Sequence, residues 1–188
     1  MVDLGVPLEP GIYGAEFAEG PGVKILERHG LHILHLAGDF NDSNFPTSVR
    51  NALGLPLPQL VGETRDGQGI RILWLAPNRW LVVSETCLNL DELKGIAAIN
   101  NIGGGRTILR LSGRNVRDLL RKGCPIDLDP QVFTAGHAFS TLLGKINVII
   151  DCIEASTFDL YVARSYDQFL CNWLTQAARE FGVQLSNG

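Results

Sequence analysis

The stretch Leu109–Gly113, LRLSG, has an earlier counterpart in Leu34–Gly38, LHLAG, and this pair decides the fold. In both stretches leucines alternate with other residues and a glycine follows, which is typical of a half-buried strand that ends in a turn. A second pair follows in the same order, because Gly54–Leu57 reads GLPL and Gly123–Ile126 reads GCPI. We therefore expect an internal repeat.

The first half of the chain predicts a strand, a short helix, two strands and a closing helix. Asn44 or Ser43 can cap the short helix, Pro46 suits its first turn, and Gly54 ends it. The turn Ala76–Arg79, APNR, has the residue types of a hairpin turn. The predicted elements cover residues 31–36, 46–53, 70–75, 80–84 and 90–98.

The second half predicts the same order of elements. They are a strand at 107–111, a helix at 114–122, a hairpin of strands 142–152 and 157–163, and a helix at 166–181. Ser165 and Gln168 fit a capping box for the last helix, and Gly182 is a stop signal. At helical spacing, this helix presents an apolar face made of Leu170, Leu174, Ala177 and Phe181.

Each half therefore reads βαββα, and the sequence predicts an α+β fold of two fused split-βαβ-like repeats. We expect antiparallel sheets with the helices packed on one face. The expected domains are an extended N-terminal arm over 1–22, a first repeat over 23–99 and a second repeat over 100–188.

Composition indicates a globular protein. Of the 188 residues, 45% are hydrophobic and 19% charged, with a net charge of −4 and no basic stripe, so we expect no nucleic-acid partner. The apolar runs are too short to span a bilayer, and the N-terminal residues have no signal-peptide pattern. We expect a cytoplasmic protein without a membrane partner. Its cysteines, which form no C-x-x-C pair, should be buried free thiols: Cys87, Cys124, Cys152 and Cys171.

Two patterns that suggest a ligand have simpler interpretations. The loop Gly103–Arg106, GGGR, precedes a strand rather than a helix, so we interpret it as a linker and not a phosphate-binding loop. On a strand, His29 and His35 would share one face while His32 points to the other, so we expect no metal site.

The run Lys122–Cys124 could present a reactive thiol, since neighbouring cations favour thiolate. The negative end of the preceding helix opposes that charge, so a structural cysteine is favoured. Asp127, Asp129, Asp151 and Glu154 lie in turns or at hairpin ends, where solvated carboxylates are expected. None of these patterns identifies a catalytic residue.

Five segments together resemble the gamma subunit of heterotetrameric sarcosine oxidase over about residues 31–182. They are LWLAPNRWLV at 73–82, GRTILRLSG at 105–113, DLLRKGCPIDL at 118–128, TLLGK at 141–145 and TFDLYVARS at 157–165. That family is in turn similar to the folate-binding aminomethyltransferases and their YgfZ-like relatives. The resemblance implies a two-part, repeat-built α+β fold.

The resemblance also implies a non-catalytic subunit with alpha, beta and delta subunits as its partners. Such a complex demethylates sarcosine oxidatively to glycine and passes the one-carbon unit to tetrahydrofolate or releases it as formaldehyde. Other subunits would carry FAD, FMN, NAD, tetrahydrofolate and zinc, and this chain would bind no cofactor or metal. Its family-motif residues would be structural or lie at an interface: Arg106, Ser112, Gly113, Lys122, Gly123, Cys124, Pro125 and Asp127.

Three alternatives stay open. One is a stand-alone, folate-binding protein of the YgfZ or aminomethyltransferase type, although Pro125–Asp127 stands where those relatives carry an aromatic residue and a Gly-Gln-Glu run. Another is a gamma-like subunit of a different N-methyl amino acid dehydrogenase, since Ile99–Gly103 departs from the gamma pattern. The third is an interaction module of an unrelated complex, because fold alone does not fix function.

Overall fold

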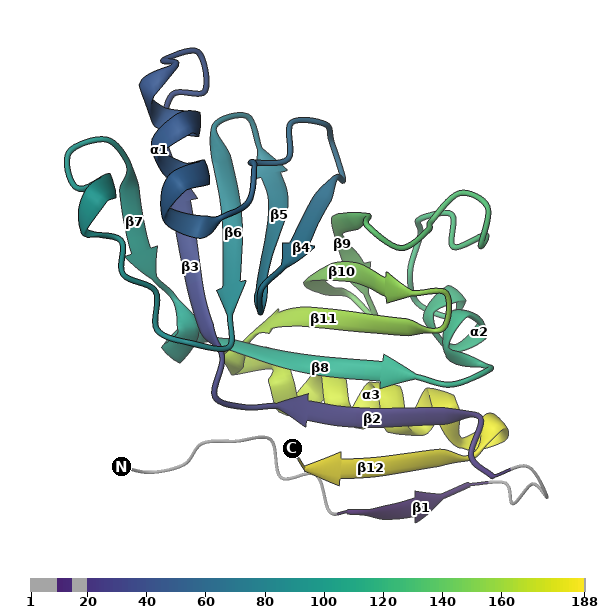
Figure 1. The fold of residues 1–188 in the computed structure, drawn as a ribbon. Coiled ribbons are helices and arrows are strands. Elements are labelled where there is room, and N and C mark those ends of the chain that lie inside the picture. The colour runs from purple at the N-terminus through teal and green to yellow at the C-terminus, as the bar shows by residue number, and fades with distance from the viewer. Residues whose placement is uncertain (1–9, 15–19, 188) are drawn as a thin grey trace. The chain divides into compact units, whose positions relative to one another are not determined.

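The computed structural model describes residues 10–14 and 20–187, which form two compact units (Figure 1). The small-sheet unit consists of Gly30–Gly104 and Gly136–Phe139. The large-sheet unit consists of the described residues of Met1–His29, Gly105–Ala135 and Ser140–Gly188. The repeat boundaries expected after residues 22 and 99 stay a prediction, and these units divide the chain at other points.

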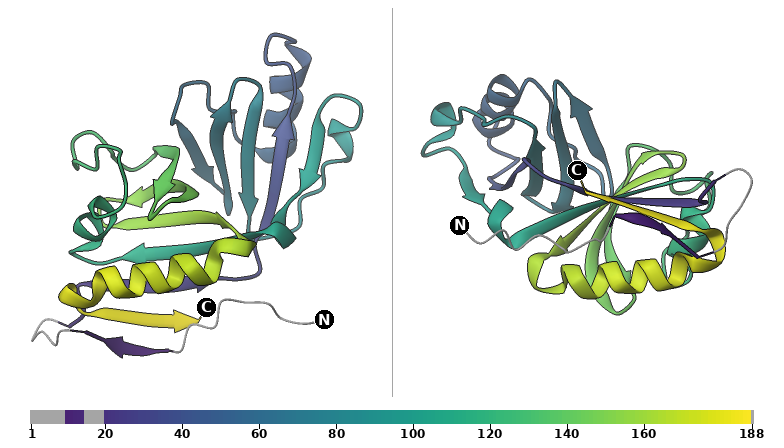
Figure 2. Two further views of the ribbon diagram at one scale, coloured as in Figure 1. Left: turned by 180° about the vertical axis from the view of Figure 1, so that it is seen from behind. Right: turned by 90° about the horizontal axis from the view of Figure 1, so that it is seen from below.

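The small-sheet unit is an antiparallel sheet with strand order β4-β5-β6-β3-β7. Helix α1 lies along one of its faces (Figures 1 and 2). A single 3₁₀ turn, η1, precedes the last strand. The elements are β3 (His32–Ala37), α1 (Asn44–Leu53), β4 (Thr64–Gly67), β5 (Ile70–Ala76), β6 (Arg79–Ser84), η1 (Asp91–Leu93) and β7 (Ala98–Asn101).

The core of the small-sheet unit is apolar and centred on Trp80. The Trp80 ring is 1% exposed and lies 5.6 Å from the ring of Phe45 and 6.0 Å from that of Phe40. Helix α1 contributes Phe45, Val49 and Leu53, whose spacing places them on one face. Gly54 ends the helix with a left-handed φ of 72°, as predicted.

The large sheet has strand order β1-β12-β2-β8-β11-β10-β9, in which β2 and β12 are parallel. Helix α3 lies along one face of this sheet (Figure 2). Short 3₁₀ turns cover Gly103–Gly105, Arg164–Tyr166 and Arg179–Phe181. The elements are β1 (Gly11–Tyr13), β2 (Val23–Arg28), β8 (Arg106–Ser112), α2 (Val116–Arg121), β9 (Ala138–Leu143), β10 (Ile146–Glu154), β11 (Thr157–Ala163), α3 (Asp167–Ala178) and β12 (Val183–Asn187).

The two sheets repeat one order of strands. In the small sheet β3 lies beside β6, followed by β5 and β4, and in the large sheet β8 lies beside β11, followed by β10 and β9. In both, a helix follows the first strand of the series. The predicted α+β fold with largely antiparallel sheets is confirmed. In the described part of the chain, no helix is long and apolar enough to cross a membrane.

The helix predicted at 90–98 is wrong. That segment holds only the 3₁₀ turn η1 and the start of strand β7. Gly95 adopts a φ of 78°, which is outside the α-helical region and breaks any longer helix. The following residues pair with β3 instead, for example Ile99 with Leu36.

The single strand predicted at 142–152 is also wrong, because the chain turns in its middle. Strand β9 ends at Leu143, Lys145 takes a positive φ of 76°, and β10 begins at Ile146. The loop linking these strands contains Gly144, whose φ of 56° suits the tight turn. The β10–β11 hairpin itself is confirmed, with Ile150 opposite Leu160.

The last helix forms as predicted, but without the predicted cap. No side chain caps α3 at Tyr166, so the predicted capping box of Ser165 and Gln168 is absent. Instead, Asp167 accepts a hydrogen bond from the backbone N–H of Gln168 and one of 3.1 Å from the Thr107 hydroxyl. The buried apolar face also differs from the predicted one: Leu170, Cys171, Leu174 and Ala178.

The arm expected over residues 1–22 falls largely outside the described residues. Within the described part, Gly11–Tyr13 forms β1, which pairs with β12 at the edge of the large sheet.

Candidate functional site

The predicted motif residues Lys122 and Gly123 lie where the end of helix α2 meets helix α3. The Lys122 ammonium group donates to the backbone carbonyl of Ala177, pairs with Glu180, and lies 4.5 Å from the centre of the Phe181 ring. A cation at this position satisfies the carbonyl groups that a helix C-terminus leaves free. Lys122 therefore fastens the end of α3 to α2.

The ring of Trp173 leaves no room for a side chain at position 123, so this residue must be glycine. A Cβ atom at Gly123 would lie 2.5 Å from Trp173 Cζ2, a distance that side-chain carbons do not tolerate. The carbonyl of Gly123 also accepts a 3.2 Å hydrogen bond from the N–H of Gly144, where an added Cβ atom would lie 3.0 Å from the same ring. The motif thus provides a slot for the tryptophan of α3.

The rest of this motif belongs to the loop after α2. The N–H of Cys124 donates to the Leu120 carbonyl at 3.0 Å, and its half-buried thiol lies 3.9 Å from the Thr141 hydroxyl. Pro125 and Asp127 are exposed, and the Asp127 carboxylate accepts a 2.9 Å bond from the N–H of Asp129. These residues shape the loop and do not converge on one point.

Arg106, Ser112 and Gly113 mark the two ends of β8, away from Lys122–Asp127 in the sequence. Arg106 pairs with Ala163 and Ser112 with Thr157 across the β8–β11 ladder. Gly113 adopts a φ of 123°, and an added Cβ would lie 2.4 Å from the Gly22 carbonyl oxygen. Only glycine accommodates this close approach.

Arg117 is a structural residue that the sequence analysis missed. It is 8% exposed, and its guanidinium donates to three backbone carbonyls: those of Ala155 at 2.9 Å, Leu128 at 2.8 Å and Phe133 at 3.0 Å. The same group lies 4.9 Å from the centre of the Phe158 ring. A buried guanidinium is tolerated because its donors are satisfied in this way.

A buried ionic cluster lies on the large sheet and was also missed. The fully buried Asp159 accepts two hydrogen bonds from Arg110, of 2.7 and 2.8 Å, and one of 3.0 Å from Arg28. The bond to Asp159 raises the pKa of Arg110 above its ordinary value. The cluster joins three neighbouring strands, because Arg28 lies on β2, Arg110 on β8 and Asp159 on β11.

The carboxylate of Asp151 lies opposite Asp159 in the β10–β11 register and is fully buried. The Tyr161 hydroxyl lies 3.4 Å from it. The expectation of a solvated side chain was therefore wrong for Asp151, whereas Asp127, Asp129 and Glu154 are exposed. A charged residue inside an apolar strand, as in TFDLYVA at 157–163, is the sequence signal that points to such a cluster.

The four cysteines differ in exposure. Cys152 and Cys171 are buried as predicted, Cys124 is half-buried, and Cys87 is exposed, against the prediction. Burial raises the pKa of the Cys171 thiol to about 12. Cys171 is therefore protonated at neutral pH and serves as an apolar packing group.

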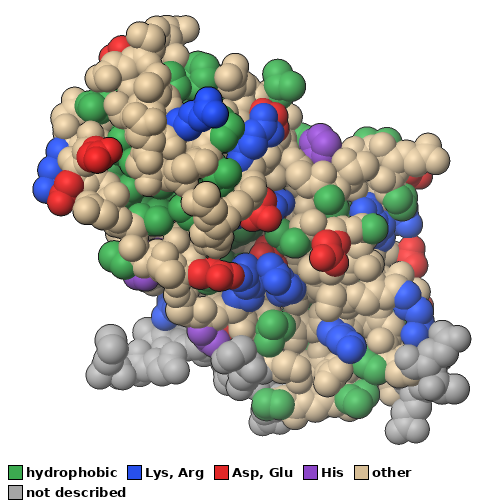
Figure 3. Space-filling view, viewed as in Figure 1, with side chains coloured by type: hydrophobic (Ala, Val, Ile, Leu, Met, Phe, Trp, Pro, Cys, Tyr) green, Lys and Arg blue, Asp and Glu red, His purple; other side chains and the backbone are tan. Residues whose placement is uncertain are grey.

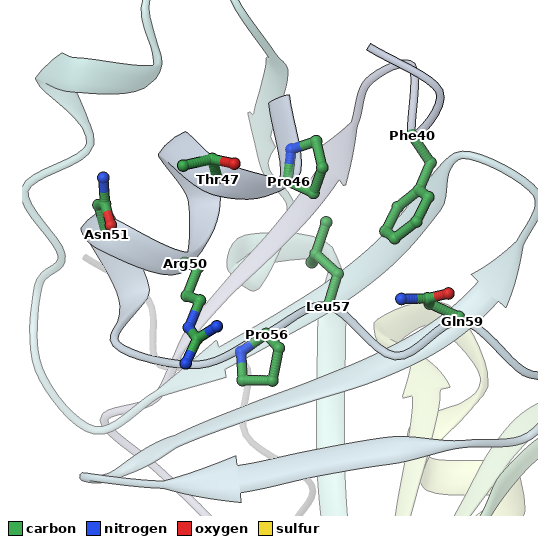
Figure 4. A pocket seen from close by; sticks show the side chains of 8 residues that line it. All are labelled: Phe40, Pro46, Thr47, Arg50, Asn51, Pro56, Leu57 and Gln59. Carbon is green, nitrogen blue, oxygen red and sulfur yellow. The ribbon is translucent and has the colours of Figure 1, made fainter. Parts of the chain in front are cut away.

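A groove of about 390 Å³ lies on the small-sheet unit between α1 and the loop that leads to β4 (Figure 4). We call it the α1 groove. Figure 4 shows the Arg50 side chain reaching from α1 towards Pro56, with Pro46, Leu57 and Phe40 along the same hollow. Its lining residues are Phe40, Pro46, Thr47, Arg50, Asn51, Pro56, Leu57 and Gln59.

The fold by itself assigns the chain to a structural class. The chain is similar to the glycine cleavage system aminomethyltransferase T from Bartonella henselae, with a TM-score of 0.57 over 88% of this chain and 48% of that one. At 13% identity this likeness shows the fold alone. The protein therefore has an aminomethyltransferase-like α+β fold.

Sequence comparison then gives the family. The model of the sarcosine oxidase gamma subunit family matches residues 37–180. The sarcosine oxidase gamma subunit of Corynebacterium sp. (strain U-96) is 31% identical over 139 residues, which are 70% of this chain and 68% of that one. The gamma subunit of Arthrobacter sp. is 32% identical over 139 residues, covering 69% and 68%.

A solved structure agrees with this assignment. The heterotetrameric sarcosine oxidase from Corynebacterium sp. U-96, in complex with pyrrole 2-carboxylate, contains a chain that is similar at a TM-score of 0.81 and 28% identity. The match covers 90% of this chain and 88% of that one. The protein belongs to the sarcosine oxidase gamma subunit family, and the predicted resemblance is confirmed.

Proposed function

We propose that this chain is a non-catalytic subunit of a cytoplasmic heterotetrameric sarcosine oxidase and assembles with alpha, beta and delta subunits. The complex demethylates sarcosine to glycine with flavin as the oxidant. The one-carbon unit passes to tetrahydrofolate or leaves as formaldehyde. FAD, FMN, NAD, tetrahydrofolate and zinc are held by the other subunits.

The observation that carries this proposal is the use of the family motif. Lys122, Gly123 and Cys124 have the composition of a reactive-thiol site, yet their contacts hold α2, α3 and the following loop together. The buried Arg117 and Asp159 are likewise engaged in structural hydrogen bonds. A motif used for internal packing fits a subunit that supports partners and leaves the chemistry to them.

The test is purification of the tagged full chain from its native host. We expect three companion chains, a flavin absorption spectrum and oxygen uptake that depends on sarcosine. Deleting the gene should lower the yield of assembled complex. A colourless single chain, or a complex that assembles unchanged without this chain, would refute the proposal.

The aminomethyltransferase-like fold suggests one rival function, which is folate binding by the isolated chain. Calorimetric titration of the full chain with tetrahydrofolate separates the two. Heat of binding that saturates at one molar equivalent, together with no companion chains, would favour the rival. No heat and a flavin-containing complex would favour the subunit.

A further inference from the structure

The α1 groove is bounded on one side by a loop whose backbone is fixed. Pro56 and Pro58 restrict its dihedral angles, and the indole N–H of the buried Trp80 donates to the Pro58 carbonyl at 2.8 Å. The Glu63 carboxylate accepts bonds from the N–H groups of Gln59 at 2.8 Å and Leu60 at 3.2 Å. The surface is therefore organised in advance of any ligand, which lowers the entropy lost on binding.

The same loop holds two large apolar side chains in solvent. Leu60 is 70% and Val61 68% exposed, the highest values among the large hydrophobic residues of the described part. The segment Leu55–Gly62, LPLPQLVG, contains no charged residue. Hydrophobic side chains also reach the surface of this unit between scattered charges on the face in Figure 3. Apolar side chains held out by a fixed loop are typical of a protein-binding surface.

One cation completes the groove. Among the described residues that line it, Arg50 is the only charged one. It is exposed, and its guanidinium forms no hydrogen bond or ion pair with the described residues. A planar guanidinium binds a carboxylate through two parallel hydrogen bonds. Charge complementarity therefore favours a ligand with an acidic group opposite Arg50.

We infer that the α1 groove, together with Leu60 and Val61, is the face on which this subunit docks to a larger subunit of the complex. An extended segment of the partner would place an apolar side chain over Leu57 and Phe40 and a carboxylate on Arg50. A small carboxylate could fill the groove but would leave Leu60 and Val61 in water, so a protein segment fits better. This inference rests on the proposed function.

The test uses co-purification of the larger subunits with tagged full-length variants. Arg50→Glu reverses the groove's charge, and Leu60→Asp places a charge on the exposed apolar loop. Matched controls are Lys94→Glu, at a cation that is 79% exposed on the same unit, and Val132→Asp, at an apolar residue that is 58% exposed on the other unit. Because all four positions are exposed, each variant should fold, and a melting temperature measured for each one shows that it does.

We expect Arg50→Glu and Leu60→Asp to reduce recovery of the larger subunits about tenfold or more, and the two controls to match the wild type. In the wild-type complex, hydrogen exchange at the amides of 55–61 should slow relative to the isolated chain. Full recovery with both test variants would overturn the docking face but leave the proposed function standing. Failure of the wild type itself to recover the larger subunits would overturn both.

Two other outcomes would identify a different occupant. A wild-type chain that runs as a dimer in solution, and as a monomer after Arg50→Glu, would assign the groove to a second copy. Saturable binding of a small carboxylate that Arg50→Glu abolishes, with assembly unchanged, would assign it to a small molecule. Either result rejects the partner segment.

Discussion

The two units share an order of strands but are held together by different interactions. The small-sheet unit relies on an apolar cluster around Trp80 and Phe45. The large-sheet unit adds buried ionic groups to its apolar core, among them Asp159 with its arginines and Arg117 with its three carbonyls. The comparison teaches that one topology can be stabilised by apolar packing or by a satisfied polar network.

The units also differ in how the repeat closes. In the large-sheet unit α3 fills the second helical position of the βαββα repeat, and the corresponding place in the small-sheet unit holds only the turn η1. In the family motif, Lys122 and Gly123 both contact α3. The small-sheet unit has no helix in the equivalent place, so these contacts have no counterpart there. Four substitutions test this contrast, in order of decreasing effect.

Trp80→Ala should destabilise the protein most, by about 3–5 kcal/mol, because it removes the largest buried side chain of the small-sheet unit. It also leaves the Pro58 carbonyl without its indole donor. Urea unfolding measures the loss in unfolding free energy. Hydrogen exchange should become faster first at the amides of β3, β5 and β6. Trp74, directly opposite on β5 and only half-buried, is the matched control. An equal loss with Trp74→Ala would mean that Trp80 is not the centre of this core.

Asp159→Asn should cost about 3 kcal/mol, since removing one partner of a buried ion cluster leaves charge without compensation. The value lies at the low end because Arg110 and Arg28 keep side-chain exposures of 30% and 20%. The control is Asp66→Asn in the small sheet, where the carboxylate is 69% exposed and 4.0 Å from Arg71, and should cost less than about 0.5 kcal/mol. Similar costs at both sites would contradict the contrast drawn between the units.

Gly123→Ala should cost about 1–3 kcal/mol, because the added methyl group overlaps the Trp173 ring. Gly104→Ala is the control, since nothing lies within 4 Å of a Cβ there. Thermal unfolding of both variants measures the difference. Adding Trp173→Leu to the Gly123→Ala variant should restore part of the loss, and a failure to do so would argue against the slot.

Glu63 should make a small, pH-dependent contribution of about 1 kcal/mol or less. Burial raises its pKa, but the backbone bonds from Gln59 and Leu60 and the charge of Arg65 outweigh burial, so the pKa lies below the ordinary 4.5. A lowered folded-state pKa gives stability that is present above about pH 4.5 and is lost as the pH falls through the folded value.

The difference in unfolding free energy between the wild type and Glu63→Gln measures this contribution. It should be constant from neutral pH to about pH 5 and shrink at lower pH. Glu92→Gln, at an exposed residue of η1, is the control for removing a surface carboxylate. A difference that grows on acidification would contradict the sign.

The repeat was predictable because its signals are local. Alternating leucines and a following glycine define β3 and β8, and the spacing of Leu170 and Leu174 defines α3. Strand β2 was missed although Val23 and Ile25 alternate, because the third buried position of that face is Glu27. A buried carboxylate is intelligible only once its neighbours in space are known.

The candidate site was harder to predict from the sequence, because its residues are neighbours only in the folded chain. Arg110 and Asp159 meet across a ladder between strands that are far apart in the chain. The run Lys122–Cys124 has the composition of a thiol site, and only its contacts with Trp173 and Ala177 reveal a packing role. The α1 groove is lined by segments whose patterns predicted a helix and a repeat motif, and none of those patterns indicates a binding surface.

The position of β2 limits the order in which the strands of the large sheet can pair during synthesis. This strand pairs with β8 through Arg28 and Ile108 and with β12 through Val23 and Val183, so it lies between partners that the ribosome delivers much later. Synthesis takes on the order of ten seconds to reach β12, and the contiguous stretch Gly30–Gly104 has emerged long before that. The nascent chain therefore holds β2 without its β12 partner until Val183–Asn187 has emerged, and this edge of β2 is open to wrong pairing during that interval.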